Sequence, residues 1–512
     1  MMYRRIFLLV IMGWIGTENM LLAQNKPDYG ALDKYIQSAV DDYNLPGLAI
    51  AIVKDDKVVF EKGYGKRNLG KLIGRGKVDE NTTFAIASQS KAYTATALAM
   101  LVDEGKLSWD DHVTDLLPGF RLHRDAATAM LRVRDLLCHR VGLNTFDGDL
   151  LWYGTGYSRT EVLRRIRHLP LKQTFRGSYG YQNVMFLAGG QLIPKVANQS
   201  WDAFVQQRIF APLNMRRSTT TAKGFQEQNN IAFPHIDREV QGFLSYDNIG
   251  PAASLHSSVA DITQWMRFWL NDGIVNGDTL LSPALIREML EVQNPLAVGA
   301  FDKRNDTHFK GYGLGWFLMD YAGRKVAHHG GGLPGYISKV MIVPEEDLGM
   351  VVLTNDMNSL PTALMYKVLD VHLKANADDR DWAQFFLDYS KRSEKRKIKA
   401  RKKEEKARVK NTSPSHETIA YAGQYLDPYY GKATVDLVDD ELRLVLEPAD
   451  ELFNATLEHW HYDTFRFQFQ DPFLPQGFVT FDIDPDGQIN SFTIKLDNPD
   501  FHFYNLDFER VE

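Results

Sequence analysis

A serine and a lysine three residues apart are the first pair in this 512-residue chain whose spacing could support chemistry. Ser88 and Lys91 precede the apolar run from Ala92 to Val102, which has a helical pattern and ends at Gly105. On a helix, residues three apart share a face, with Cβ atoms about 5–6 Å apart. An amine in apolar surroundings loses its proton more readily, so Lys91 could activate the Ser88 hydroxyl as a nucleophile. Taken alone, the pair is better explained by a helix-capping serine and a surface lysine.

A tyrosine and an asparagine form a second pair. Tyr181 and Asn183 follow the turn from Gly177 to Gly180 and open the helical run from Val184 to Val196. A loop-to-helix junction can direct both side chains into a cleft. Tyr181 would then relay protons to or from a leaving group, and Asn183 would hydrogen-bond Lys91 or a substrate amide. The alternative is a packing tyrosine and a capping asparagine.

A glycine-rich segment supplies the third motif. His329 is followed by Gly330, Gly331 and Gly332, just before a predicted strand from Ile337 to Val343. Glycine-rich backbone on an edge strand lets a substrate chain approach and pair with it. The N–H of Gly332 would complete an oxyanion hole with the N–H of Ser88. Paired histidines could also bind a metal ion, but no third ligand stands nearby in the sequence, so we expect no metal and no cofactor.

The elements that would hold these motifs alternate along the first three quarters of the chain. An amphipathic helix is predicted from Leu32 to Tyr43, and a hairpin follows from Leu48 to Tyr64. Three more strands are predicted much later, over Gly313–Met319, Ile337–Val343 and Met350–Thr354. Strands at both ends with mostly helical sequence between them predict an α+β fold: one antiparallel sheet, split in sequence, with a helical insertion.

The last quarter of the chain has a different pattern of predicted secondary structure. Residues 416–512 contain short strand patterns separated by turn signals, which predict a small all-β domain, either a sandwich or a barrel. Residues 376–415 form the connection. Its segment from Lys391 to Lys410 carries twelve basic and three acidic residues, which favours a solvated linker helix over a contact with a cell wall or membrane surface.

The order and spacing of S-x-x-K, Y-x-N and H-x-G resemble the serine β-lactamase and penicillin-binding-protein family, specifically class C enzymes and their esterase, D-aminopeptidase and D-alanyl-D-alanine carboxypeptidase relatives. Three further segments support the resemblance, which covers about Leu32 to Val371: Leu136–Leu143, Pro212–Met215 and Tyr312–Trp316. The resemblance implies a β-lactamase-like sheet with flanking helices over residues 28–375. It also implies that Ser88 is the nucleophile and that Lys91 and Tyr181 are the acid–base groups. Asn183 would be the positioning amide. The substrate-binding strand would carry His329, Gly331 and Gly332. The C-terminal β domain looks like a module of unknown function that is often appended to such hydrolases.

One departure from the family pattern bears on substrate choice. Penicillin-hydrolysing members typically carry Lys-Thr-Gly where this chain has His329, Gly330 and Gly331. A neutral imidazole and a glycine would hold a β-lactam carboxylate poorly. We therefore expect hydrolysis of a small amide or ester, such as a D-peptide, through an acyl-enzyme. A class C-like β-lactamase and a non-catalytic wall-binding protein are the alternatives, and the complete Ser, Lys, Tyr and Asn set argues against the latter.

Composition and the N-terminus set the remaining expectations. Arg4 and Arg5 followed by the apolar stretch Ile6–Ile15 predict a signal peptide over residues 1–23, and hence a periplasmic or secreted protein without a stable membrane anchor.

The single cysteine, Cys138, excludes an internal disulfide, and its apolar setting predicts an inert thiol. A net charge of −6 gives no reason to expect nucleic acid. The expected partner is a small molecule or peptide, with cell-wall peptide as one option.

Overall fold

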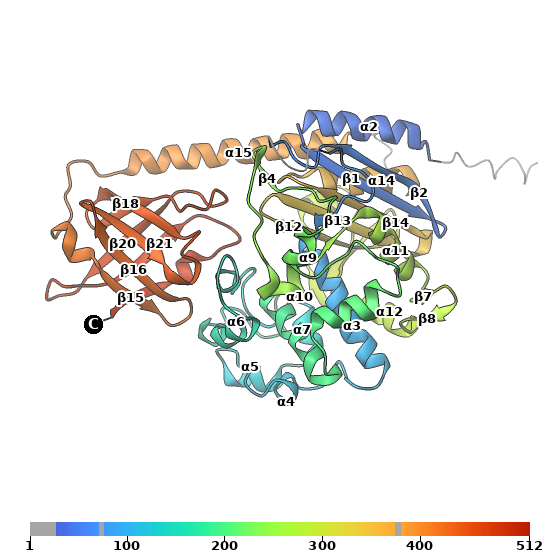
Figure 1. Cartoon of the computed structure of the whole chain (residues 1–512), viewed down its shortest axis with the longest axis horizontal. Coiled ribbons are helices and arrows are strands. Elements are labelled where there is room, and N and C mark those ends of the chain that lie inside the picture. The colour runs from blue at the N-terminus through green and yellow to red at the C-terminus, as the bar shows by residue number, and fades with distance from the viewer. Residues whose placement is uncertain (1–26, 71–75, 374–379, 512) are drawn as a thin grey trace, which may run out of the picture.

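The computed structural model of the chain describes residues 27–70, 76–373 and 380–511. The predicted signal peptide lies outside these ranges. Two bodies are visible in Figure 1: a large α/β body and a small β-barrel, joined along one side by the long helix α15. No helix in the described ranges is both long and apolar enough to cross a bilayer.

An eight-stranded antiparallel sheet forms the centre of the large body, in the order β2-β1-β14-β13-β12-β11-β10-β9. The N-terminal hairpin joins the late strands because β1 pairs with β14, with Leu48 opposite Thr354. This is the predicted sheet, split in sequence. The strands are β1 (Gly47–Lys54), β2 (Lys57–Gly65), β9 (Asn294–Leu296), β10 (Lys310–Tyr312), β11 (Phe317–Tyr321), β12 (Arg324–Leu333), β13 (Tyr336–Val343) and β14 (Leu348–Thr354).

The sheet separates two hydrophobic cores because successive side chains on its strands point to opposite faces. One face packs under α2 (Tyr29–Asp42), α14 (Leu360–Leu373) and the start of α15 (Trp382–Ala407). The other face carries α11 (Val259–Leu270) and the helical insertion. Along β1 the alternation is complete: Leu48, Ile50 and Ile52 belong to the first core, and Ala49, Ala51 and Val53 to the second.

The helical insertion is built around two buried helices, α3 (Ser90–Asp103) and α7 (Asn183–Ala197). Both match predicted helical runs, since small and apolar residues occupy nearly all their positions. The other helices are α4 (Val113–Leu116), α5 (Asp125–Met130), α6 (Arg159–Arg165), α8 (Trp201–Val205), α9 (Ala222–Gln226), α10 (Gly250–Ala253), α12 (Pro283–Met289) and α13 (Ala300–Lys303). Three short strand pairs brace them: β3 (Phe84–Ala85) with β6 (His256–Ser257), β4 (His235–Ile236) with β5 (Glu239–Val240), and β7 (Ile274–Val275) with β8 (Asp278–Thr279).

The C-terminal domain is a closed eight-stranded barrel, one of the two predicted architectures. Closure comes from β15 pairing with both β16 and β22, which leaves no free sheet edge. Its aromatic interior includes Tyr425, Phe481 and Phe492. The strands are β15 (Gly423–Asp427), β16 (Gly431–Val438), β17 (Glu441–Leu446), β18 (Asn454–His461), β19 (Thr464–Phe467), β20 (Gly477–Ile483), β21 (Ile489–Leu496) and β22 (Asp507–Val511).

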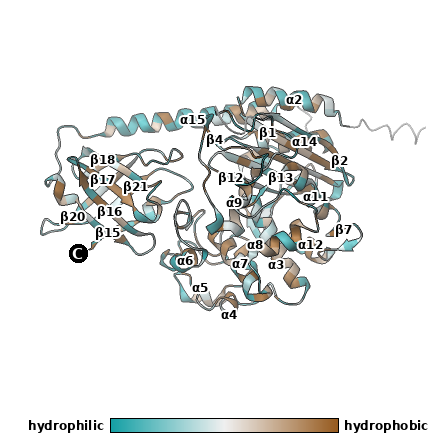
Figure 2. Ribbon diagram, in the orientation of Figure 1, coloured by the Kyte–Doolittle hydropathy of each residue, from teal (hydrophilic) through white to brown (hydrophobic). Residues whose placement is uncertain are grey.

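The charged connection is a single helix of 26 residues, α15. Its first turn is anchored in the large body, where Trp382 is buried and donates a hydrogen bond to Asp370. Most of its length is hydrophilic, as Figure 2 shows. Its end reaches the barrel through ion pairs of Glu404 with Lys495 and of Glu405 with Arg466. The basic run is thus a solvated helix that links the two bodies.

Two strand predictions differ from the structure. The predicted strand over Gly313–Met319 is interrupted, because Gly315 adopts a left-handed φ of 83° in the turn between β10 and β11. The glycine segment of β12 is also not on an outer strand. However, β11 pairs with β12 only as far as His328, whereas β13 continues to Leu333, so along this half of β12 the edge toward β11 has no strand neighbour in the described chain.

Candidate active site

Ser88 lies in a tight turn, Ala87–Gln89, between β3 and α3. Ala87 directly before it adopts a left-handed φ of 51°, a strained conformation for a residue with a Cβ. The turn is held on both sides, because Ser338 Oγ donates to the Ile86 carbonyl at 2.8 Å and Ser90 Oγ donates to the Ala87 carbonyl at 2.6 Å. These contacts fix Ser88 at the base of a cleft.

Lys91 follows one turn later, fully buried on α3. Its Nζ lies 3.0 Å from Ser88 Oγ, 2.6 Å from Asn183 Oδ1 and 3.1 Å from the Ala252 carbonyl oxygen. The amide and carbonyl oxygens can only accept hydrogen bonds. In the neutral amine, two N–H groups therefore point at these oxygens, and the lone pair faces the Ser88 hydroxyl.

Burial lowers the pKa of Lys91 to about 7 from its ordinary 10.5, and the nearby Asp149 opposes this shift. Near pH 7 about half of the amine is then neutral, compared with roughly one part in a few thousand for an exposed lysine. The neutral form of this amine can accept a proton at neutral pH, as a base for Ser88 would have to do.

A buried carboxyl group orients the amide of Asn183. Asp149 accepts a hydrogen bond from Asn183 Nδ2 at 2.7 Å with one oxygen and from Trp152 Nε1 at 2.9 Å with the other. Because Asn183 Nδ2 is used in this way, its Oδ1 must face Lys91. Burial raises the pKa of Asp149 to about 8.

Tyr181 lies over the same lysine, with its ring centroid 4.7 Å from Lys91 Nζ, and its hydroxyl hydrogen-bonds the Ser88 side chain. Burial holds the pKa of Tyr181 well above 10, so the phenol keeps its proton at neutral pH. The His139 ring lies 4.2 Å from the Tyr181 ring, and His139 Nδ1 accepts from the N–H of Gln182. Burial lowers the pKa of His139 well below 6.5, so this neighbour is neutral.

The glycines of β12 pack beside the Ser88 turn. A Cβ on Gly331 would lie 2.2 Å from the Ile86 carbonyl oxygen, so only glycine fits there without moving the turn. A Cβ on Gly332 would meet nothing closer than Ile337 Cδ1, at 3.4 Å. Gly331 therefore permits close packing, while the exposed Gly332 leaves the free edge of β12 open to a ligand.

His329 is buried and has both ring nitrogens engaged. Nδ1 donates to the Gly330 carbonyl at 2.6 Å, and Nε2 accepts from the Tyr312 hydroxyl at 3.0 Å. Burial lowers its pKa to about 3. His329 is thus a neutral part of the cleft wall, with no free donor for a substrate carboxylate.

Ser88 opens into a cleft of about 670 Å³ that both bodies line. Tyr181, Asn183 and the β12 glycines line this cleft, and the barrel adds Phe473, Asp500 and Phe501. Two barrel loops dock against Tyr153, one between β19 and β20 and one between β21 and β22: Phe501 packs with its ring centroid 4.2 Å from that of Tyr153, and Tyr153 donates to Asp471 at 2.8 Å. The barrel is therefore part of the site.

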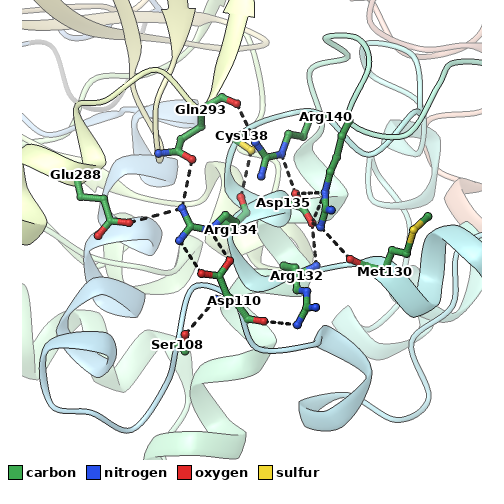
Figure 3. Close-up of polar contacts among 11 residues, drawn as sticks. Ser108, Asp110, Met130, Arg132, Arg134, Asp135, Cys138, Arg140, Glu288 and Gln293 are labelled. Atoms are coloured by element: carbon green, nitrogen blue, oxygen red, sulfur yellow. Dashed lines mark hydrogen bonds and ion pairs between the residues drawn. The ribbon is translucent and has the colours of Figure 1, made fainter.

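A polar cluster surrounds Asp135 in the segment that leads to His139 (Figure 3). Fully buried Asp135 accepts from Arg140 at 2.7 Å and from Arg176 at 2.6 Å. In the same figure Cys138 donates to the Arg134 carbonyl. Burial raises the pKa of Cys138 to about 12, which makes its thiol a poor nucleophile. This cluster is structural.

The structure therefore brings Ser88, Lys91, Tyr181 and Asn183 together and places Gly331 and Gly332 beside them. Sequence reasoning assigned no role to His139, Asp149 or the two barrel loops that line the cleft. Asp149 did carry a signal: it stands directly before the apolar run Leu150–Trp152, a setting in which a carboxyl group needs buried donors. No group of three or more His, Cys, Asp or Glu side chains in the described chain could hold a metal ion.

A serine in contact with a buried lysine at the start of a helix, beside the free edge of an antiparallel sheet, is the arrangement expected of a serine hydrolase of the β-lactamase type. The chain belongs to the Beta-lactamase family, whose profile matches residues 32–372. A second profile, a domain of unknown function termed DUF3471, matches residues 407–510. These matches confirm the resemblance drawn from the three motifs.

Relatives in sequence and structure extend this result. The chain is 26% identical over 468 residues to unguisins hydrolase ungD of Aspergillus violaceofuscus, covering 85% of this chain and 80% of that protein. It is 25% identical over 335 residues to protein flp of Staphylococcus aureus, covering 63% of this chain and 62% of that protein. Two solved structures share its fold, each at 21% identity. The octameric penicillin-binding protein homologue from Pyrococcus abyssi has a TM-score of 0.60, and the match covers 94% of this chain and 99% of that one. The D-amino acid amidase from Ochrobactrum anthropi has a TM-score of 0.55, and the match covers 67% of this chain and 98% of that one.

Proposed function

We propose that this protein cleaves a small amide or ester, such as a D-peptide, a D-amino-acid amide or a short ester, through an acyl-enzyme on Ser88. The observation that carries the proposal is the geometry of Lys91. Its two fixed acceptors, Asn183 Oδ1 and the Ala252 carbonyl, leave only the direction of Ser88 Oγ for the lone pair of the neutral amine. The names of an unguisins hydrolase and a D-amino acid amidase among the similar proteins support the choice of substrate class.

The proposed reaction has two halves. Ser88 Oγ attacks the carbonyl carbon while its proton passes to Lys91 Nζ, and the oxyanion is held by the N–H groups of Ser88 and Gly332. Tyr181 donates its phenolic proton to the leaving group and is reprotonated from Lys91. A water molecule then attacks the acyl-enzyme, giving its proton to the same pair, and the acid is released with Ser88 restored.

Mass spectrometry after incubation with a fluorophosphonate tests the nucleophile. We expect one covalent adduct on the wild type and none on Ser88→Ala. General acid–base groups contribute about 10²–10⁴-fold, so Lys91→Ala and Tyr181→Phe should each lose that much in kcat. Labelling that persists in Ser88→Ala would refute the assignment.

A substrate panel tests the chemistry. D- and L-amino-acid anilides, short p-nitrophenyl esters and a chromogenic cephalosporin should be compared on the same preparation. We expect esters or D-amides to be hydrolysed well and the cephalosporin poorly, because His329, at the position where β-lactamases carry the lysine that holds the β-lactam carboxylate, is neutral and has no free donor. Cephalosporin turnover as fast as that of the best ester would instead establish a β-lactamase.

Export is a separate part of the proposal. It rests on the basic and apolar pattern of residues 1–23, which lie outside the described ranges. Fractionation of cells that express the full chain, with N-terminal sequencing of the product, would test it. An unprocessed N-terminus on cytoplasmic protein would contradict the proposal.

A further inference from the structure

The cleft continues past the free edge of β12 to the opposite face of the sheet, where Lys339 lines it. Ser338 and Gly331 face the Ser88 turn, as their contacts with Ile86 show. Because side chains alternate along a strand, Gly330 and Lys339 face the other way. The two are direct partners in the register of β12 with β13, so the Lys339 side chain lies across the glycine segment.

Lys339 has no partner for its charge in the described part of the chain. Its neighbour Lys310 differs, because Lys310 is ion-paired with Asp302 at 3.0 Å. Burial lowers the pKa of Lys339 to about 8, and the charge of Lys310 adds to this effect. A largely buried ammonium without a counter-ion is costly, and a bound anion would remove that cost.

The absence of a side chain at Gly330 keeps this ammonium accessible from the strand edge. A Cβ at Gly330 would lie 3.8 Å from Lys339 Nζ, so any side chain there would fill the space between the amine and the strand. On the same side of the strand, His328 Nδ1 is buried without a hydrogen-bond partner. An acceptor-rich group that enters along β12 would therefore meet two polar nitrogens.

We propose that Lys339 binds a carboxylate of the substrate whose scissile bond lies at Ser88, which makes the natural substrate an anionic ester or peptide. The inference rests on the proposed function, since it names the substrate class of the same site. His329 cannot take this role, because both its ring nitrogens are engaged within the protein. The cation instead comes from Lys339 on the neighbouring strand β13, which pairs with Gly330, the residue after His329.

The test compares Lys339→Met with wild type on matched ester pairs. One pair is p-nitrophenyl butyrate with mono-p-nitrophenyl succinate, which carries a carboxylate on the acyl side. The other is methyl 3-acetoxybenzoate with 3-acetoxybenzoate, which carries it on the leaving side. Lys339→Arg keeps the charge in the cleft. Lys325→Met removes one positive charge from an exposed position on β12 and is the matched control.

We expect wild type to show a lower KM for at least one anionic ester than for its neutral partner. In Lys339→Met that KM should rise about tenfold to a hundredfold, the range of a charge-assisted hydrogen bond, while neutral esters keep their kcat and KM. Lys339→Arg should retain most of the preference, and Lys325→Met all of it. Neutral-ester turnover also reports that each variant is folded, and Lys339→Gln replaces the methionine variant if that one is not.

Two results would overturn the inference. One is a wild type with no preference for either anionic ester, and the other is a preference that survives in Lys339→Met. In both cases Ser88-dependent hydrolysis of neutral esters would leave the proposed function intact. Absence of any Ser88-dependent hydrolysis would instead refute the proposed function itself.

Discussion

Replacement of Asp149 by asparagine separates the geometric and the electrostatic roles of the Lys91–Asn183–Asp149 chain. In the wild type, two donors, Asn183 Nδ2 and Trp152 Nε1, each meet one carboxyl oxygen. An amide at position 149 keeps one oxygen and turns an NH₂ group toward the other donor. One buried donor then loses its acceptor, at a cost of about 1–3 kcal/mol.

The substitution affects the reaction through Asn183. If the Asn183 amide rotates so that its NH₂ group no longer faces the NH₂ group at position 149, that NH₂ group faces Lys91 instead. The Lys91 amine then loses the acceptor that directs its lone pair at Ser88. We therefore expect kcat for a neutral ester to fall about fivefold to a hundredfold in Asp149→Asn, the kinetic equivalent of the same energy.

The pH profile provides a second, independent readout. The ionised form of Asp149 raises the pKa of Lys91, but burial raises the pKa of Asp149 to about 8, so this carboxyl is largely protonated where Lys91 titrates. Because the reaction needs the neutral amine, the acid limb of kcat/KM should move only slightly, and to lower pH, even as the maximum falls. Thermal unfolding and the exposed charge control Asp125→Asn complete the assay. A limb that moves to higher pH, or an unchanged rate and profile, would refute the reasoning.

Three further predictions concern the surroundings of the site. Gly331→Ala should slow fluorophosphonate labelling of Ser88 at least tenfold, because its Cβ would lie 2.2 Å from the Ile86 carbonyl oxygen. The control variant Gly332→Ala should be labelled nearly as fast as wild type, and equal labelling rates in the two variants would contradict the prediction. Asp135→Asn should lower the free energy of unfolding by about 3–5 kcal/mol, since it leaves two arginines beside a buried neutral side chain; an unchanged denaturant midpoint would count against it. Cys138 should resist iodoacetamide in the native protein and react only after unfolding, as followed by intact mass; rapid native alkylation would show that its thiol is accessible.

The elements that depend on local sequence could be predicted. Helix α3 follows from an uninterrupted run of small and apolar residues, and the three-residue spacing of Ser88 and Lys91 needs only helical geometry to bring them within 3.0 Å. The contact of Asn183 with Lys91 joins residues 92 positions apart. The sequence predicts that Asn183, which opens a helix at a loop junction, reaches into a cleft, and it leaves Lys91 and a substrate amide as alternative partners.

Features that depend on docking could not be predicted. Asp149 gains its role only when α7 brings Asn183 against it, and no spacing in the sequence encodes that contact. The half-free edge of β12 depends on where β11 stops pairing, which is a matter of register rather than of composition. The part of the cleft formed by Phe501 requires two separately folded bodies to meet.

The pairing of α15 with the barrel depends on the rotational phase of the helix. An α-helix turns about 100° and advances about 1.5 Å with each residue. Because α15 is anchored by Trp382 at one end, a one-residue deletion in its middle would turn Glu404 and Glu405 by about 100° and break their ion pairs with the barrel. The barrel would keep its own contacts with the large body, such as Phe501 against Tyr153, so residues 408–422 would have to take up the change. The basic helix, which contacts no reacting group, thus acts as a spacer whose residue count decides which of its side chains face the barrel.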